Sequence, residues 1–270
     1  MNQDLNPKKC YTLGYGDLPI DTFVYILNKV GIDLIVDVRS SPYSRFNPCF
    51  NRDNLENSLM RNGIYYMYSG DQIGGRYSNP NLLYPDGTVN YQKVRNTELF
   101  QDGINQLLSI ISSGRRIALL CMEREPERCH RFLLISRDLQ SRGIKVIHVL
   151  PEIRLLANED LEKELIGAMV DTKQTSISEE PRNPVDLMYE KLNRKIAYKV
   201  KSYHAPSDEG APVATVIGIA KEQGRDTPVE DPGMNCVREP DYGDEGLPLP
   251  LSSGTDLSHM KKHVQQKLIF

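Results

Sequence analysis

The sequence predicts an α/β fold: a mainly parallel five-stranded sheet with helices on both faces, followed by a mostly disordered C-terminal tail. Between residues 10 and 150, short apolar runs that suit buried strands alternate with segments whose apolar residues recur at helical spacing. Such alternation implies crossover connections between parallel strands. After residue 171, polar residues, proline and glycine dominate, and this composition cannot bury enough apolar surface to offset its ordering entropy.

A strand, a helix and a second strand are expected at the start of the domain. Residues 11–15 suit the first strand, and Pro19 then opens a helix that Gly31 ends. The apolar residues between these two positions recur at helical spacing. The continuous apolar run of residues 34–36 predicts a second strand that is buried on both faces.

The middle of the domain is expected to hold a helix that Asn51 caps, a strand over residues 64–68 and a helix over residues 98–111. Residues 70–96 show no periodicity. A loop this long inside a compact domain is usually functional or disordered.

The stretch of residues 116–131 is expected to hold the chemistry. Its apolar run, residues 117–120, predicts a buried strand that delivers Cys121 to its carboxyl end. Apolar residues resume after a polar loop, so a helix is expected to begin near Glu127, with Cys129 in its first turn. Because open parallel sheets bind their ligands at the carboxyl ends of strands, this edge is the predicted site.

The domain ends with a fifth strand, expected over residues 146–149 after Gly143 has closed the preceding helix. The predicted organisation is therefore an α/β domain over residues 10–150, a helical extension over residues 151–170 and a mostly disordered tail over residues 171–270. Within that tail, residues 185–200 suit a marginal helix.

Composition narrows the class of protein. Residues 1–150 carry a net charge of +3 (18 basic minus 15 acidic residues), which is too small an excess to indicate nucleic-acid binding by itself. The cysteines are odd in number and show no Cys-x-x-Cys spacing, which argues against a secreted disulfide scaffold. No signal peptide or long apolar run is found. We therefore expect a cytoplasmic protein without membrane association.

Four neighbouring residues are the predicted catalytic group. Cys129 is the first candidate, because the free N–H groups and dipole of a helix N-terminus stabilise a thiolate. Cys121 is either a second thiol or a core residue. His130 suits a general base or hydrogen-bond donor, or equally a surface helix residue or a core histidine bonded to a backbone carbonyl. Glu123 suits an acid or base beside Cys121. Since consecutive helical residues point about 100° apart, at most two of Cys129, His130 and Arg131 should line the site.

Arginines and glycines from several segments are expected to bind an anionic ligand at the same edge. Asp37 and Arg39 follow the second strand and point to one side, because strand side chains alternate. A framework ion pair between them is the alternative, and a solvated surface charge is the alternative for the arginines in loops. The predicted ligand-binding residues are Asp37, Arg39, Arg45, Gly74, Gly75, Arg76 and Arg131.

A zinc site formed by Cys121, Cys129 and His130, with Cys49 as the fourth ligand, is a further alternative. Zinc sites normally show two close ligand pairs, whereas Cys49 stands alone in another element. The prediction therefore includes no metal and no other cofactor.

The motifs occur in a recognisable order: Asp37-Val-Arg-Ser-x-Pro, Ser44-Arg45, Phe50-Asn51, Gly74-Gly75-Arg76 and Leu120-Cys-x-Glu-x-x-Pro-x-x-Cys-His-Arg131, closing with His148. Over roughly residues 10–150 the chain resembles the family catalogued as domain of unknown function 488, which implies a cytoplasmic α/β protein. Its layout is also similar to rhodaneses and cysteine phosphatases, whose loop of N–H groups surrounds an anion beside a thiolate. Here the corresponding loop, residues 122–128, is bulky and acidic and contains Pro126, so sulfur or phosphoryl transfer by Cys121 is not implied.

These observations predict a cytoplasmic enzyme in which the thiolate of Cys129, with or without Cys121, acts on an anionic or nucleotide-like small molecule in an arginine-lined cleft. The alternative is a non-catalytic module that binds a nucleotide or a nucleic acid, with cysteines that only pack. A protein that works through its tail has the least support, because the tail lacks an aromatic-basic pattern and a strong amphipathic stretch.

Overall fold

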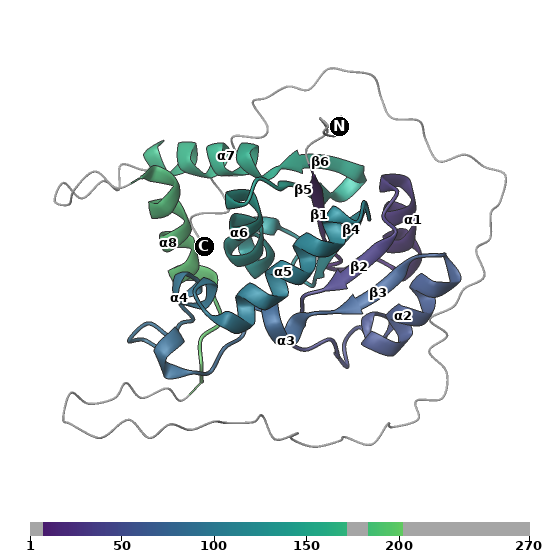
Figure 1. Cartoon of the computed structure of the whole chain (residues 1–270), viewed down its shortest axis with the longest axis horizontal. Helices are drawn as coiled ribbons and strands as arrows, with labels where there is room; N and C mark the ends of the chain where they lie inside the picture. The colour runs from purple at the N-terminus through teal and green to yellow at the C-terminus, as the bar shows by residue number, and fades with distance from the viewer. Residues whose placement is uncertain (1–7, 172–182, 202–270) are drawn as a thin grey trace.

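Six strands form one mixed sheet in the order β3-β2-β4-β1-β5-β6, in a computed structural model that describes residues 8–171 and 183–201 (Figure 1). The α/β class is confirmed, and the five expected strands are parallel. The strands are β1 (Lys9–Gly14), β2 (Leu34–Asp37), β3 (Tyr65–Tyr68), β4 (Ile117–Cys121), β5 (Lys145–Leu150) and β6 (Arg154–Ala157).

The expectation of five strands was wrong by one edge strand. Residues 154–157, which were expected to begin a helical extension, form β6 and pair antiparallel with β5. This strand is short and lacks the continuous buried run of a central strand, because its first two residues are exposed. A sheet edge needs no apolar residues on its outer side, so the sequence pattern did not reveal it.

Strand β4 lies in the centre of the sheet, and all five of its residues are buried. It sits between β2 and β1, with Cys121 opposite Gly14 and Leu120 opposite Asp37. The chain after β1 leads into α1 on one face of the sheet, whereas the chain after β4 leads into η4 and α6 on the other face. The carboxyl ends of β1 and β4 therefore flank a topological switch point, where open α/β sheets bind ligands.

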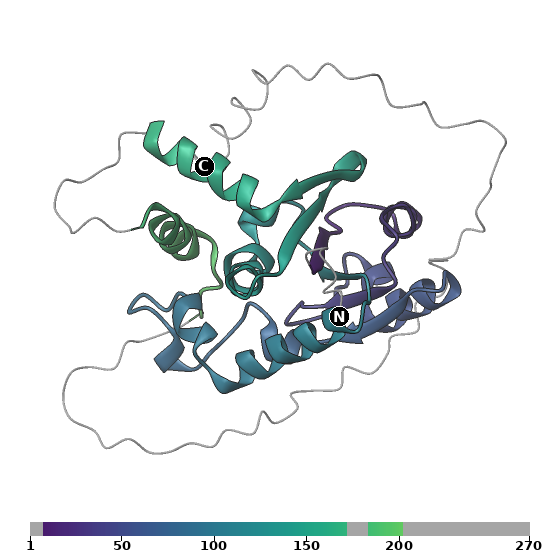
Figure 2. The ribbon, with the colours of Figure 1, turned by 45° about the horizontal axis from the view of Figure 1, so that its top comes forward.

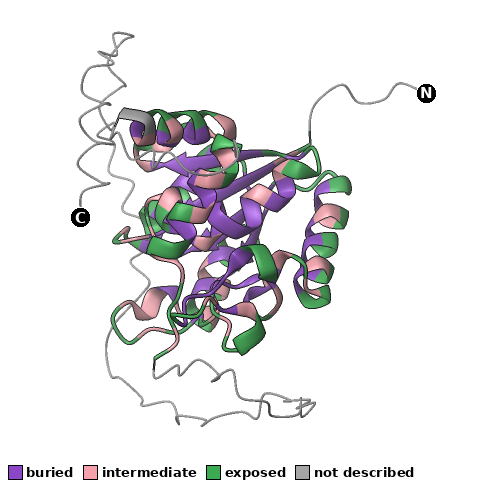
Figure 3. Ribbon diagram, turned by 90° about the vertical axis from the view of Figure 1, so that its left-hand side faces the viewer, coloured by how far each residue is buried: buried purple, intermediate pink, exposed green. Residues whose placement is uncertain are grey.

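Helices cover both faces of the sheet, and their buried sides fill two apolar cores (Figures 2 and 3). One face packs against α1 (Ile20–Val30) and α2 (Arg52–Arg61). The other packs against α5 (Glu98–Ser112), α6 (Arg137–Ser141), α7 (Asn158–Asp171) and α8 (Pro184–Ile196). Cys121 and Cys129 belong to this second core.

The segment of residues 70–96 is more regular than its lack of periodicity suggested. It contains α3 (Gly70–Ile73), the 3-10 turn η2 (Pro80–Leu82) and α4 (Tyr91–Arg95). Each element is too short to show a helical period in the sequence. Asn90 caps α4 through its side-chain oxygen.

The helix expected from Glu127 is interrupted. A 3-10 turn, η3 (Pro126–Arg128), comes first, and Cys129 then adopts an extended conformation with φ −133° and ψ 145°. The chain continues from His130 into a π-helical segment, η4 (Arg131–Ser136), that leads into α6. Cys129 therefore lies just before the helix and not in its first turn.

The marginal helix expected in the tail is α8, which is part of the second core. Met188, Tyr189 and Leu192 are buried, and the Tyr189 ring stacks on Phe132 with centroids 5.1 Å apart. Helix α8 packs against α7 and η4. The rest of the predicted disordered tail, residues 172–182 and 202–270, lies outside the described residues.

Candidate functional site

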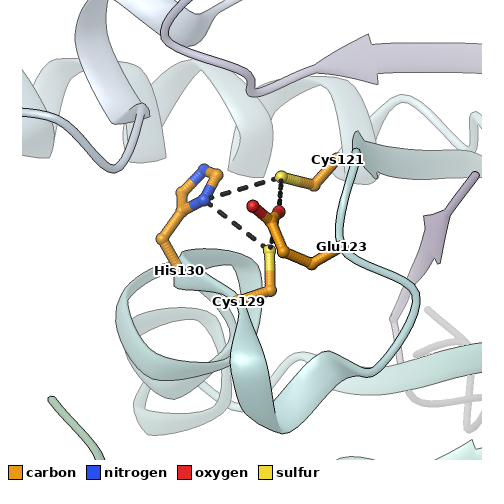
Figure 4. A group of neighbouring side chains, drawn as sticks. All are labelled: Cys121, Glu123, Cys129 and His130. Carbon is orange, nitrogen blue, oxygen red and sulfur yellow. Dashed lines mark hydrogen bonds between the residues drawn. The ribbon is translucent and has the colours of Figure 1, made fainter. Parts of the chain in front are cut away.

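Four side chains converge beyond the carboxyl end of β4: Cys121, Glu123, Cys129 and His130 (Figure 4). Their potential ligand atoms all lie within 4.8 Å of one another. Cys121 is the last residue of β4, Glu123 lies two residues further in the following loop, and Cys129 and His130 lie where that loop enters η4. The predicted catalytic residues are thus brought together, and we call them the Cys–Glu–His cluster.

The Glu123 carboxylate lies between the two thiols. Its Oε2 atom is 2.7 Å from Cys121 Sγ and 3.2 Å from Cys129 Sγ, and both thiols donate to it. The Nδ1 atom of His130 lies 3.7 Å from each sulfur. The other ring nitrogen of His130, Nε2, is 2.9 Å from the Val38 carbonyl oxygen. Because a carbonyl only accepts, Nε2 donates, and the Nδ1 lone pair faces the sulfurs in the neutral ring.

Cys129 has the role of a helix N-cap. Its carbonyl accepts from the amides of Phe132 and Leu133, both at 3.1 Å. Its sulfur accepts from the Arg131 amide at 3.5 Å. The extended backbone at Cys129 turns its side chain and that of His130 toward the cluster, whereas Arg131 points elsewhere.

The guanidinium of Arg131 holds the loop that carries Glu123. It is 1 % exposed and donates to the carbonyls of Glu123 and, at 2.9 Å, Arg124. Gly14 makes room for this contact, because a Cβ there would lie 1.7 Å from the Glu123 carbonyl oxygen and 2.6 Å from Arg131 Nη1. The structure therefore places Arg131 in the framework that positions the loop.

The glycine pair of residues 74 and 75 is explained by close packing. A Cβ on Gly75 would lie 2.8 Å from Cγ of His130, and one on Gly74 would lie 2.4 Å from Oγ of Ser40. The neighbouring Arg76 is exposed, its amide donates to Ser40, and its guanidinium lies over the Tyr198 ring. Gly75 thus packs closely against His130, next to the Cβ, Cγ and Nδ1 atoms of that side chain.

Asp37 and Arg39, the two neighbours of the Val38 that bonds His130, form a buried ion pair. Arg39 Nη2 lies 2.6 Å from Asp37 Oδ2, and the Tyr66 hydroxyl donates to the same carboxylate at 2.8 Å. A third contact joins Arg39 Nη1 to the Tyr15 hydroxyl. Arg45 lies apart in an exposed loop, over the ring of its neighbour Phe46.

Burial and charge shift the protonation of the cluster. Burial raises the pKa of the Cys121 thiol well above its usual value, and the adjacent Cys129 adds to this effect. Burial also opposes ionisation of Glu123, but hydrogen bonds from Cys121 and other donors outweigh it and lower the pKa of that carboxyl. For His130, the neighbouring Cys121 and Glu123 outweigh burial and raise the pKa.

One residue of the cluster replaces an earlier expectation. The zinc alternative needed Cys49 as the fourth ligand, but Cys49 lies in the 3-10 turn η1 (Pro48–Phe50), outside the cluster. Glu123 takes that place. A signal was present in the sequence, since Glu123 follows Cys121, the last residue of β4, by only two positions.

A model of one protein family, described as "Domain of unknown function DUF488", matches residues 19–137. Comparisons with curated proteins and with solved structures gave no match. Among the described residues, no helix has the length and apolar character needed to cross a membrane.

Proposed function

Residues 19–137 belong to the family described as domain of unknown function DUF488, and because that description states no activity, we propose a function from the site itself. The protein is a metalloprotein that holds one divalent transition-metal ion, zinc before others, in the Cys–Glu–His cluster. The convergence of four metal-ligating side chains on one point supports this proposal above all.

The spacing of the donors suits a tetrahedral ion. With metal–sulfur bonds of about 2.3 Å and metal–nitrogen bonds of about 2.0–2.1 Å, neighbouring ligand atoms lie about 3.5–3.8 Å apart. The two sulfur–nitrogen separations at His130, both 3.7 Å, fall in this range. Thiolate and imidazole ligands favour zinc over magnesium or calcium, which prefer oxygen.

The surroundings of His130 are those of a metal ligand. Histidines that bind metals usually donate their other ring N–H to a carbonyl or carboxylate, which fixes the tautomer and the ring orientation. His130 makes this contact with Val38, and Gly75 packs against the ring. The ring is therefore held with its lone pair toward both sulfurs before any ion arrives.

Charge gives an independent argument. Cys121 and Cys129 are 4 % and 1 % exposed, and a carboxylate lies between them. Burial raises the pKa of the Cys121 thiol well above its usual value, so this arrangement does not activate Cys121 as a free thiolate. A bound dication reverses that effect, because a coordinating thiol is deprotonated.

The test is the metal content of the full-length protein, measured by mass spectrometry after purification without added metal and after reconstitution with zinc. We expect about one ion per chain, lost in Cys129→Ser and in His130→Ala. Cys10→Ala is the matched control, because Cys10 is a buried thiol at the other end of β1 and should retain the metal. A wild-type chain that binds no zinc contradicts the proposal.

Thiol chemistry on an anionic or nucleotide-like molecule is the second candidate function. The amide of Arg131 that donates to Cys129 Sγ supports it, since this contact stabilises a thiolate. Arg39 and Arg131 support it less, because both guanidinium groups are buried and bonded within the protein. Iodoacetamide at pH 7 separates the two candidates: a nucleophilic thiol labels faster than a free thiol, whereas thiols that bind zinc are protected until a chelator is added.

A further inference from the structure

Glu123 differs from the other members of the Cys–Glu–His cluster. Cys121 ends a central strand, Cys129 caps a helix, and His130 is held by Val38 and Gly75. Glu123 is less buried than either cysteine and lies on a loop between two exposed neighbours, Met122 and Arg124. Its side chain is also the longest and most flexible of the four.

The Glu123 carboxylate lies too close to the sulfurs to coincide with a ligand position. Its distances of 2.7 and 3.2 Å to the two sulfurs are shorter than the separation of about 3.5 Å expected between oxygen and sulfur ligands of one zinc ion. The oxygen therefore occupies part of the volume that an ion bonded to both sulfurs requires. Entry of the ion moves this carboxylate outward.

The movement must come from the side chain. Arg131 holds the carbonyls of Glu123 and Arg124, and Gly14 packs directly against this contact, so the backbone of the loop is fixed. The sulfurs and the histidine are on the rigid side of the cluster. The carboxylate is therefore left to move by rotation of its own side chain, on a loop whose neighbouring residue Met122 is 52 % exposed.

We infer that Glu123 is the exchangeable ligand of the centre, and that the position it vacates takes water or a small anion. This inference rests on the proposed metal centre. Two thiolates balance a dication, so without the carboxylate the centre is neutral and does not repel an incoming anion. Three protein ligands and one open position are the arrangement of catalytic zinc sites, whereas structural sites are closed.

The test uses cobalt-loaded full-length protein, because tetrahedral cobalt reports its ligands in the visible spectrum. Glu123→Ala should keep about one ion per chain and lose no more than about tenfold in affinity, far less than Cys129→Ser. Azide should change the cobalt spectrum of Glu123→Ala at a concentration at least about tenfold lower than in the wild type. Glu98→Ala, which removes an exposed carboxylate from the first turn of α5, should behave as the wild type.

Two results overturn the inference while leaving the metal centre intact: Glu123→Ala losing its ion as completely as Cys129→Ser, or azide leaving the spectrum of Glu123→Ala unchanged. Failure of the proposed function looks different, because the wild type itself then binds no cobalt and no zinc, and the inference falls with it. A closed, structural site is the conclusion if metal binds but the fourth position does not exchange.

Discussion

The described part of the chain holds two histidines, His130 and His148, whose surroundings differ in one respect. Both ring nitrogens of His148 on β5 have a partner in the protein: Nε2 donates to Asn158 Oδ1 at 3.0 Å, and the Thr12 hydroxyl donates to Nδ1 at 2.8 Å. His130 has a carbonyl on one nitrogen only, and its second nitrogen faces two sulfurs at 3.7 Å.

The network around His148 is closed. Asn158 also donates to Glu162 and Gln140, and the Tyr189 hydroxyl donates to Glu162 at 2.8 Å. Donors and acceptors are thereby matched across β1, β5, α7 and α8. Such a network stabilises one arrangement of these elements and leaves neither ring nitrogen of His148 free for a ligand.

The Cys–Glu–His cluster has the opposite balance. With both thiols deprotonated, its four potential ligand atoms would all be acceptors with no donor among them, which is why we propose a cation there. The partners of the two ring nitrogens, and not burial, therefore distinguish a histidine of the framework from one at a site. His148 belongs to the framework and His130 to the site.

The largest expected effect comes from opening the closed network. Asn158→Leu removes the partner of His148 and leaves Glu162 and Tyr189 with fewer bonds, so the free energy of unfolding should fall by about 4 kcal/mol. Urea denaturation in the presence of a chelator measures this. Zinc stoichiometry should stay unchanged, and loss of the metal in this variant would contradict the separation of the two centres.

Acid should act on the same network. Burial, aided by the charge of Arg131, lowers the pKa of His148 from 6.5 to about 3. Between these values the unfolded chain binds a proton that the folded protein excludes, so stability is complete above about pH 6.5 and falls on acidification.

The free energy of unfolding should have fallen by roughly 3 kcal/mol at pH 4 because of this histidine. The measurement is the free energy of unfolding of the metal-free protein between pH 7 and pH 4. In His148→Gln, which cannot titrate, the dependence should flatten by that amount; an equal slope in both proteins would show that His148 is not the group responsible.

Substitution of Gly75, which packs against His130, should lower zinc affinity more than it lowers the stability of the fold. In Gly75→Ala the new methyl group meets the imidazole at 2.8 Å and displaces it from the sulfurs. We expect zinc affinity to fall by about 10–100-fold, as for loss of other contacts that orient a metal ligand. Competition with a chromophoric chelator measures it, and Gly167→Ala is a control in α7 where a Cβ meets nothing. An unchanged affinity would mean that His130 is not a ligand.

The smallest effect tests whether α8 supports the cluster. Asn193 accepts from the Tyr91 amide and donates to the Val89 carbonyl, and the Tyr91 hydroxyl donates to the carbonyl of Gly75. Asn193→Ala should lower stability by about 1–2 kcal/mol and zinc affinity by less than about tenfold. Asn183→Ala, which removes the N-cap of α8, should lower stability by about 1 kcal/mol and leave affinity unchanged. Equal changes of zinc affinity in both variants would show that the contacts of Asn193 with Val89 and Tyr91 do not support the cluster.

The fold was predictable where burial is continuous. Strand β4 and strand β2 consist of buried residues only, so their apolar runs stand out in the sequence. Strand β6 and helix α4 were not predictable, because they are short and depend on neighbours for their hydrogen bonds. The interruption of the helix at Cys129 was also hidden, since helical spacing resumes immediately after it.

The members of the Cys–Glu–His cluster were predictable from the sequence, whereas the contacts that hold them in place were not. Cys121, Glu123, Cys129 and His130 lie within ten positions of the chain, so local patterns were enough to select them. Arg131 and Gly75 were selected with them as ligand contacts, but their partners are Gly14, the Glu123 carbonyl and the His130 ring. Such partners come from distant segments, and spacing does not identify them.

The sequence by itself determined the α/β class, the strand at the centre of the sheet and the edge at which the reactive side chains gather, because periodicity and apolar runs are local properties of a chain. Tertiary structure alone decided which polar groups are matched and which are left to face one another. That balance depends on hydrogen-bond partners brought together by folding, and it separates His148, with a partner on each ring nitrogen, from His130, whose Nδ1 faces two sulfurs.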